Sequence, residues 1–233
     1  MPTTRAWSAV VAEDDESTRL LVTSLLEQER FTVAQCRDGS AVVDLAHELD
    51  PDLVVLDVGL PVRSGVEACR KIREFSNAYV VLLTGKDSEA DKLVGFSAGC
   101  DDYVTKPFSP AELTARVRAV QRRLGDDGGG PDAIRQFGPL SIDPGAREVL
   151  LDERPVELTR TEFELLATLS ASPRLAFSRS QLIEAVWGAD WFGDDHLIDV
   201  HISNLRRKLG DDPRVPRFIA TVRGVGYRMG SGD

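Results

Sequence analysis

Acidic, hydroxyl and ammonium side chains follow short apolar segments in the first half of this 233-residue chain. Asp57 comes directly after a run of Leu and Val residues, and Glu13 and Asp14 come directly after a run of Ala and Val. Two further runs lead into Thr84 and Lys106. Three carboxylates that lie close together repel one another unless a cation neutralises them, and Mg²⁺ prefers such oxygen ligands. A phosphoryl group would bind the metal, the hydroxyl and the ammonium at once, with Asp57 placed to attack it in line.

The order of apolar runs and helical patterns predicts how these side chains come together. A short, continuous Leu and Val run is typical of a strand that is buried on both faces of a parallel sheet. We expect strands at residues 9–12, 31–36, 53–57, 78–84 and 103–105. We expect helices around residues 20–26 and at 40–49, 66–75, 87–98 and 110–124. This alternation predicts an α/β doubly wound, five-stranded parallel sheet, whose carboxyl edge is where ligands bind.

Each of these side chains also has an ordinary structural interpretation. Asp57 or Thr84 can cap a helix, Lys106 can be a solvated loop lysine, and Tyr103 can be a core residue. For any one residue, the ordinary interpretation is the more common one. If every ordinary interpretation were correct, the chemically suitable side chains would stand at several strand ends by separate coincidences. We therefore favour one shared site.

The same residues resemble the receiver domain of two-component response regulators, over roughly residues 7–124. The resemblance implies a flavodoxin-like fold in which Asp57 accepts a phosphoryl group from a sensor histidine kinase. It also implies that Glu13, Asp14, Asp57 and the backbone carbonyl of Gly59 hold Mg²⁺.

The resemblance further implies a conformational switch. The peptide bond between Lys106 and Pro107 is expected to be cis, as X-Pro bonds can be. The phosphoryl group is expected to draw the Thr84 hydroxyl inward, and the Tyr103 ring to fill the vacated space. Such a change is a population shift between two packings.

The loop at residues 61–65 departs from the family pattern. It reads Pro-Val-Arg-Ser-Gly, whereas Pro-Gly-Met-Asp-Gly is usual in the family. Gly65 is kept, but the bulkier Val62 and Arg63 are expected to alter the loop geometry and the docking of the kinase.

Charged residues on the last two expected helices and the fifth strand match positions by which OmpR/PhoB-type receivers pair symmetrically. The resemblance implies a homodimer, formed on phosphorylation, with these ion pairs across its two-fold axis: Lys92 with Glu112, Asp101 with Arg118, and Asp102 with Arg116. Arg116 also lies four residues after Glu112, so a pair within one helix is the alternative. Exposed pairs contribute little free energy, so their role would be register and specificity.

Length and composition indicate two globular domains in a reducing, cytoplasmic environment. The chain has 42% hydrophobic and 28% charged residues, and 233 residues suit two domains better than one. Its cysteines, Cys36, Cys69 and Cys100, lack the paired spacing of a disulfide framework or a zinc site. No apolar run approaches the ~18 residues of a membrane span, and the N-terminus lacks an apolar signal core. We therefore expect no membrane partner.

The net charge of −10 is unevenly distributed along the chain. From Arg206 to Arg228 there are seven basic and two acidic residues, a local charge of 7 − 2 = +5. A nucleic-acid-binding surface near the C-terminus is therefore compatible with an acidic protein.

The second half begins after a Gly- and Asp-rich stretch at residues 125–133, which predicts a flexible linker. Short strand patterns follow at residues 136–140, 141–143, 148–151 and 156–158. Thr159 and Ser178 are predicted to cap two helices, the first with Glu162 in a capping box. A third helix is expected to open at Asp194 or Asp195 and to run through 209, and a hairpin with a glycine turn is expected at 218–229.

This arrangement resembles the winged helix-turn-helix effector domain of the OmpR/PhoB family, over roughly residues 134–230. The most specific stretches are residues 158–166, 199–202 and 222–228. The resemblance places helix 194–209 in the major groove of double-stranded promoter DNA and Arg223 in the adjacent minor groove. The positions that match family DNA contacts are His196, His201, Ser203, Asn204, Arg206, Thr221 and Arg223.

Several of these positions depart from the family pattern or have an alternative interpretation. The family often carries arginine where His196, Ser203 and Asn204 stand, which implies fewer phosphate contacts and a weaker dependence of binding on salt. Asn204 can read adenine or contact only phosphate, and His201 can equally be a packed helix residue. We favour Arg206 and Arg223 as the main contacts.

The loop at residues 188–193 matches the region by which the family contacts RNA polymerase. Trp191 and Phe192 in this loop resemble exposed contact residues, but a core role for Trp191 is equally compatible with the sequence.

We therefore predict a DNA-binding transcriptional regulator of a two-component system that phosphorylation activates. Receiver pairing would raise DNA affinity through effective concentration. A phosphatase that uses a strand-end aspartate is disfavoured because its second aspartate is replaced by Gly59. The alternative that stays open is a DNA-binding regulator whose receiver is only structural and independent of phosphorylation.

Overall fold

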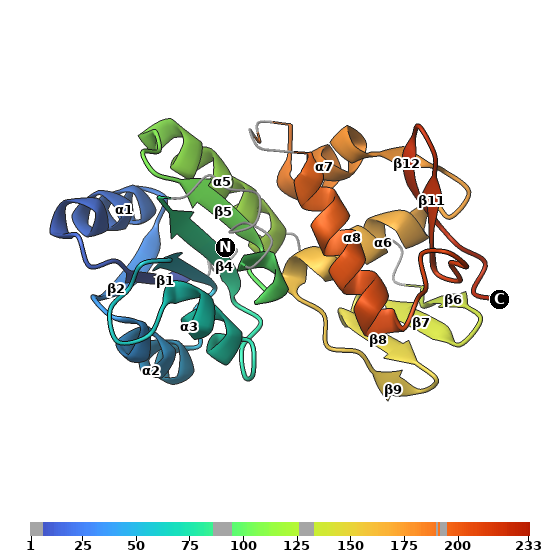
Figure 1. The fold of residues 1–233 in the computed structure, drawn as a ribbon, viewed down its shortest axis with the longest axis horizontal. Helices are drawn as coiled ribbons and strands as arrows, with labels where there is room; N and C mark the ends of the chain where they lie inside the picture. The colour runs from blue at the N-terminus through green and yellow to red at the C-terminus, as the bar shows by residue number, and fades with distance from the viewer. Residues whose placement is uncertain (1–6, 86–94, 126–132, 190, 192–194) are drawn as a thin grey trace, which may run out of the picture. The chain divides into compact units, whose positions relative to one another are not determined.

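The computed structural model describes residues 7–85, 95–125, 133–189, 191 and 195–233. The chain divides into two compact units, Met1–Gln121 and Arg122–Asp233, which we call the N-terminal and C-terminal units. Figure 1 shows that the strands of each unit form separate sheets, and each unit also has its own buried residues.

The N-terminal unit is built on a five-stranded parallel sheet with the order β2-β1-β3-β4-β5. Its strands are β1 (Trp7–Ala12), β2 (Phe31–Cys36), β3 (Leu53–Asp57), β4 (Tyr79–Thr84) and β5 (Asp102–Thr105). Every residue of β3 and β4 is buried, as expected for central strands that are covered on both faces. The predicted doubly wound parallel sheet is therefore confirmed.

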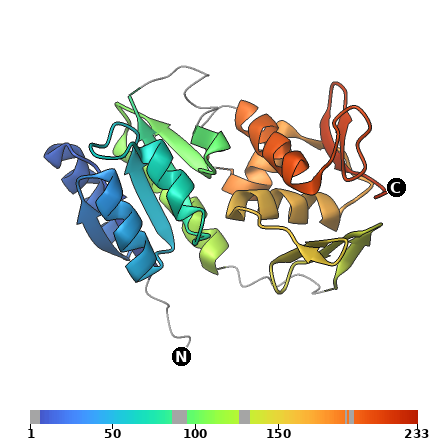
Figure 2. The same ribbon diagram turned by 60° about the horizontal axis from the view of Figure 1, so that its bottom comes forward.

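Helices cover both faces of this sheet. They are α1 (Glu16–Gln28), α2 (Gly39–Leu49), α3 (Gly65–Ile72) and α5 (Pro110–Gly125). Figures 1 and 2 show α2 and α3 together on one face, with α1 and α5 on the other. Asp15 and Asp38 cap α1 and α2 by accepting backbone N–H bonds, and Ser64 opens α3 in a capping box with Glu67.

Strand register places the chemically active residues at one edge. Ala12 pairs with Leu56 across β1 and β3, so Glu13 follows at the level of Asp57. Asp57 pairs with Leu83, the residue before Thr84. Parallel pairing thus brings the ends of β1, β3 and β4 to the same level.

The C-terminal unit combines two small antiparallel sheets with three helices. The four-stranded sheet contains β6 (Arg135–Phe137), β7 (Leu140–Asp143), β8 (Glu148–Leu151) and β9 (Arg154–Pro155), in that order. The helices are α6 (Arg160–Ala171), α7 (Arg179–Trp187) and α8 (His196–Leu209). The second sheet has the order β10-β12-β11, with β10 (Phe177–Ser178), β11 (Ile219–Val222) and β12 (Gly226–Met229). We call the β11–β12 hairpin the wing.

The predicted caps at Thr159 and Ser178 are confirmed. Thr159 forms a capping box with Glu162, and Ser178 forms one with Gln181. Asp195 precedes α8, but its side chain makes no capping hydrogen bond.

Some expected elements differ from the structure. The helix expected at 66–75 ends at Ile72, because residues 73–75 form turns. The strand expected at 156–158 is replaced by β9, two residues earlier. Most of the helix expected at 87–98 and most of the linker expected at 125–133 lie outside the described residues. Among the described residues, no helix is long and apolar enough to cross a membrane.

The buried face of β3 yields a stability prediction. Leu56→Ala deletes a side chain that is 0% exposed, so we expect the free energy of unfolding of the N-terminal unit to fall by about 2–5 kcal/mol. Leu20→Ala, at a position that is 54% exposed on α1, is the control and should change it by less than about 0.5 kcal/mol. Urea denaturation of the whole chain measures both. Equal costs for the two variants would contradict a packed β3.

Candidate functional site

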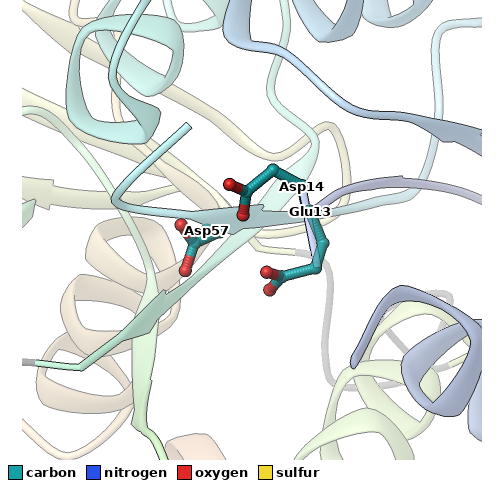
Figure 3. A group of neighbouring side chains, drawn as sticks. All are labelled: Glu13, Asp14 and Asp57. Atoms are coloured by element: carbon teal, nitrogen blue, oxygen red, sulfur yellow. The ribbon is translucent and has the colours of Figure 1, made fainter. Parts of the chain in front are cut away.

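Three carboxylates converge at the carboxyl edge of the parallel sheet (Figure 3). One oxygen from each of Glu13, Asp14 and Asp57 lies within 4.8 Å of the others. Glu13 and Asp57 are buried and Asp14 is exposed, so the group is open on one side. The sequence prediction that these acids come together is confirmed by this geometry.

Lys106 lies against two of these carboxylates. Its Nζ donates to Asp57 Oδ1 at 2.5 Å and to Glu13 Oε2 at 2.6 Å. The four side chains carry a formal charge of −3 + 1 = −2, from three carboxylates and one ammonium. An oxygen-rich group with two uncompensated negative charges fits a hard divalent cation such as Mg²⁺.

Burial and neighbouring charges shift the protonation of this pair. Burial raises the pKa of Glu13; the hydrogen bond from Lys106 opposes this rise, and the negative charge of Asp57 adds to it. Burial alone would lower the pKa of Lys106, but hydrogen bonds and attraction from Asp57 and Glu13 outweigh it and raise that pKa. Lys106 therefore stays charged throughout the physiological pH range.

Hydrogen bonds between backbone groups and side chains hold the acidic loops in place. The Gly59 N–H donates to Asp57 Oδ2 at 2.7 Å, so the other carboxylate oxygen is also engaged. Arg19 on α1 is buried, and its Nη1 donates to the carbonyls of Glu13 at 3.0 Å and Asp14 at 3.3 Å. Sequence reasoning missed Arg19, because nothing in its local pattern shows that it turns back to the strand end.

The loop after β3 depends on close backbone approach. A Cβ on Gly65 would lie 2.1 Å from the carbonyl oxygen of Asp57, which explains why this glycine is kept. Val62 has a φ of 67° and is 84% exposed, a costly conformation for a β-branched residue. The departure from the family pattern thus puts a strained residue in the loop after β3.

The expected switch residues lie on β4 and β5. Thr84 is buried at the end of β4, and its carbonyl accepts the Lys106 N–H at 2.7 Å. The half-buried Tyr103 ring contacts the Phe96 ring edge to face, with centroids 5.4 Å apart. The Lys106–Pro107 peptide bond is cis, as expected.

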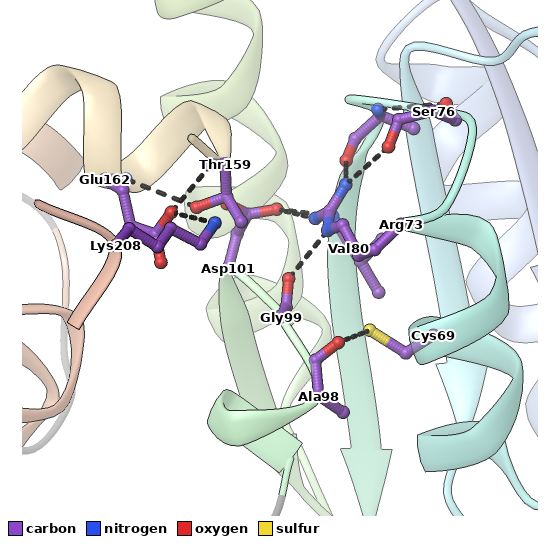
Figure 4. A network of polar contacts seen from close by, with 11 residues as sticks. Cys69, Arg73, Ser76, Val80, Ala98, Gly99, Asp101, Thr159, Glu162 and Lys208 are labelled. Atoms are coloured by element: carbon purple, nitrogen blue, oxygen red, sulfur yellow. Dashed lines mark hydrogen bonds and ion pairs between the residues drawn. The ribbon is translucent and has the colours of Figure 1, made fainter. Parts of the chain in front are cut away.

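The described residues that were expected to pair two chains are engaged within one chain. Asp101 is 0% exposed, and it accepts bonds from Arg73 and from the Val80 N–H (Figure 4). Arg73 also donates to the carbonyl of Gly99. A carboxylate in this position cannot reach an arginine of another chain, so Asp101 does not belong to an exposed pairing surface.

The other charged positions that the structure describes also have partners in their own chain. Arg116 Nη1 binds both carboxylate oxygens of Asp102 at 2.7 Å, and its Nη2 donates to Glu112 at 3.0 Å. Arg118 forms an ion pair of 2.8 Å with Glu29. Lys92 lies outside the described residues.

The seven expected DNA contacts separate into two groups. His196, Ser203, Thr221 and Arg223 are exposed. His201, Asn204 and Arg206 are buried, which disagrees with contact to DNA in this conformation. The preference for Arg206 is therefore corrected, whereas the alternative of a packed His201 agrees with its 1% exposure.

Packing explains why two of these side chains turn inward. The His201 ring lies 5.7 Å from the Trp187 ring, centroid to centroid. Arg206 Nη2 donates to the carbonyl of Ile219 at 2.7 Å and to Thr221 Oγ1 at 2.8 Å. Both side chains are committed to holding α8 against its neighbours.

An exposed face of α8 includes a residue that the sequence prediction omitted. His196, Ser203 and Arg207 are exposed, and Val200 between them is half-buried. Their spacing of four, three and four residues puts them on one side of the helix. Arg207 could have been found from this spacing, because it continues the row that starts at His196.

Trp191 is a core residue. It is buried, and its ring lies 5.8 Å from that of Trp187, so it is not an exposed contact. Phe192 lies outside the described residues.

Comparisons with known proteins agree with both halves of the chain. A model described as "Response regulator receiver domain" matches residues 9–118, and one described as "Transcriptional regulatory protein, C terminal" matches residues 153–229.

Curated relatives match along almost the whole length. The chain is 40% identical to the sensory transduction protein RegX3 of Mycolicibacterium smegmatis over 224 residues, which covers 95% of this chain and 98% of RegX3. It is 42% identical to the DNA-binding response regulator MtrA of the same organism over 221 residues, which covers 95% of this chain and 96% of MtrA.

Solved structures give the same result. A RitR mutant superposes with a TM-score of 0.80 at 27% identity and covers 97% of this chain and 100% of its own. DrrB, an OmpR/PhoB homologue from Thermotoga maritima, has a TM-score of 0.53 at 35% identity with the same coverage. The chain therefore belongs to the OmpR/PhoB-type response regulators, which join a receiver domain to a DNA-binding transcriptional regulatory domain.

Proposed function

We propose that Asp57 is the phosphoacceptor of this response regulator and takes its phosphoryl group from a sensor histidine kinase. The observation that carries the proposal is the convergence of Glu13, Asp14 and Asp57 around the Lys106 ammonium. Asp57 is the carboxylate at the end of the central strand, beside the Thr84 strand.

The transfer replaces a phosphorus–nitrogen bond with a phosphorus–oxygen bond. One carboxylate oxygen of Asp57 attacks the phosphorus, and the phosphohistidine nitrogen leaves with the bonding electron pair. Glu13, Asp14, Asp57 and the Gly59 carbonyl would hold Mg²⁺, which, when bound, neutralises charge on the phosphoryl oxygens. The chain thus acts as a phosphoacceptor rather than as an enzyme with turnover on a substrate.

The surrounding side chains stabilise the phosphorylated state. The Lys106 ammonium now lies against Asp57 and would pair with a phosphoryl oxygen. The Thr84 hydroxyl would donate to another, and Tyr103 would move into the space that Thr84 leaves. These movements shift the population of two packings.

Phosphorylation would favour a homodimer through the face that carries β5 and α5. Among the described members of the proposed surface, Glu112 and Arg118 lie at least partly in solvent. We include Lys92 in this surface from the sequence alone. The Asp102–Arg116 pair would join it only by exchanging partners between chains, because it is closed within one chain here.

The proposed promoter DNA surface consists of one face of α8 and the tip of the wing. We assign major-groove contacts to His196, Ser203 and Arg207, and a minor-groove contact to Arg223. Thr221 lies at the root of the wing, where its hydroxyl accepts from Arg206. The loop at residues 188–193 is proposed to meet RNA polymerase through residues other than Trp191, and the site of action is the cytoplasm.

The phosphoacceptor role gives a test by molecular mass. Beryllium fluoride mimics a bound phosphoryl group, so with Mg²⁺ it should drive the wild type from monomer to dimer. Asp57→Asn should stay monomeric, because the acceptor carboxylate is gone. Sedimentation equilibrium measures the mass, and Asp44→Asn, on the exposed face of α2, is the matched control. An unchanged mass in the wild type would instead support a structural, phosphorylation-independent receiver.

The position of Lys106 predicts two opposite effects of one substitution. Lys106→Met removes a positive charge beside the acids, so Mg²⁺ affinity should rise roughly tenfold. The same variant should lose the response to beryllium fluoride, because its cationic partner is missing. Titration calorimetry measures the affinity, and Lys71→Met, in an exposed pair with Glu74, is the control. A fall in Mg²⁺ affinity would show that Lys106 is not a competitor of the metal.

The exposed face of α8 predicts which arginine contacts DNA phosphate. Arg207→Ala should weaken DNA binding roughly tenfold and reduce the slope of log affinity against log salt by about 0.9. Arg154→Ala, on the exposed strand β9, should change neither quantity. Fluorescence anisotropy at several salt concentrations measures both. An unchanged slope for Arg207→Ala would remove Arg207 from the interface.

A further inference from the structure

A polar and aromatic network joins α8 to the root of the wing, by which we mean Ile219, Thr221 and Tyr227. Arg206 lies at its centre and is 9% exposed. Its guanidinium donates to the Ile219 carbonyl from Nε at 3.2 Å and from Nη2 at 2.7 Å, and Nη2 also donates to Thr221 Oγ1 at 2.8 Å. One side chain of α8 therefore binds two residues of β11.

The second wing strand contributes Tyr227 to the same network. The Arg206 guanidinium lies 5.6 Å from the centroid of the Tyr227 ring, and the Arg179 guanidinium lies 5.4 Å from it. Cations near an aromatic face are attracted by its quadrupole, most strongly where water is excluded. Tyr227 is buried, so water is largely excluded from its ring and both arginines contribute to holding the ring in place.

The Tyr227 hydroxyl completes the connection to α8. It donates to Asp199 Oδ1 at 2.7 Å, and Arg179 Nε donates to the same oxygen at 2.7 Å. Burial, followed by the hydrogen bond to Asp199, raises the pKa of Tyr227 to about 12. The hydroxyl therefore remains a donor at neutral pH, and Arg179 offsets the Asp199 charge.

Backbone packing reinforces the same region. Strand β12 lies between β10 and β11, and Tyr227 pairs with Phe177 on one side and Thr221 on the other. A Cβ on Gly226 would lie 2.1 Å from the carbonyl oxygen of Phe177, so only glycine permits this approach. The root of the wing is thus fixed on three sides, whereas Arg223, Gly224 and Val225 at its tip are exposed.

We propose that Arg206 and Tyr227 are positioning residues that set the wing against α8, so that Arg223 reaches DNA together with the exposed face of α8. Arg206 acts through the wing and not through a phosphate, because its Nε and Nη2 are bound to β11. The proposal rests on the DNA surface assigned above, and it explains why a basic residue of the recognition helix is buried.

A substitution series separates positioning from phosphate contact. A lysine keeps a point charge but cannot reproduce the forked contact of an arginine. Arg206→Lys should therefore weaken DNA binding about as much as Arg206→Met. At the exposed neighbour, Arg207→Lys should retain most of the wild-type affinity. Wild-type affinity in Arg206→Lys would overturn the proposal.

A double-mutant cycle with Arg223 tests the coupling directly. If Arg206 acts by placing the wing, its loss costs little once the wing contact is already gone. We expect Arg206→Met and Arg223→Ala to weaken binding roughly tenfold each, and together roughly tenfold rather than a hundredfold. A hundredfold loss in the double variant would show independent contacts and overturn the proposal.

The measurements use the full chain and a fluorescent duplex that carries the tightest site the wild type selects from a random-sequence library. Thermal unfolding identifies variants that fail to fold. Tyr227→Phe, which removes the hydroxyl that donates to Asp199 and keeps the ring, then replaces Arg206→Met in the cycle and should be non-additive with Arg223→Ala in the same way. A wild type that selects no duplex would contradict DNA binding itself, whereas additive losses in a wild type that does bind would contradict only the positioning role.

Discussion

The ion pairs of Lys106 with Asp57 and Glu13 are the interaction on which the N-terminal unit depends. Buried carboxylates are costly unless they are paired, and removing one partner of such a pair leaves an uncompensated charge. The pairing requires β1, β3 and β5 to end at one edge, because each strand delivers one of the three groups. The strand order β2-β1-β3-β4-β5 therefore also brings these three charged groups together.

The C-terminal unit uses its buried charges differently. Asp211 accepts the backbone N–H groups of Arg217, Phe218 and Ile219, and Lys208 pairs with the buried Glu162 at 2.7 Å (Figure 4). These contacts hold the end of α8 against the start of β11 and the first turn of α6. Glu162 thus neutralises one of the basic charges counted from the sequence, whereas Arg207 on α8 and Arg223 and Arg228 in the wing are exposed.

Much of the fold could be predicted because its signals are local. A strand such as β3 is a run of Leu and Val that ends in an acid, and the caps at Thr159 and Ser178 are formed by residues three positions apart. The convergence of Glu13, Asp14 and Asp57 also followed from sequence, since parallel strands end at a common edge.

The rest could not be predicted because it depends on partners far away in the chain. Helical spacing identifies the face of α8, but it does not show that His201 packs on Trp187 or that Arg206 binds β11. Asp101 and Asp102 are neighbours with the same side chain, yet Asp101 pairs with Arg73, directly after α3, and Asp102 pairs with Arg116 on α5. Such choices are made by tertiary packing, which overrides residue type.

The same reasoning bears on the proposed pairing of two receivers. Arg116 and Arg118 already have acidic partners within their own chain, so an ion pair across a dimer would replace an existing pair rather than add one. An exchange between equivalent pairs contributes little net free energy, and an exposed pair contributes little in the first place. Charge can therefore set the register of such a dimer, but the driving force must come from a change in the shape of the face itself. Under the proposed function, the phosphorylation of Asp57 would have to supply that change in shape.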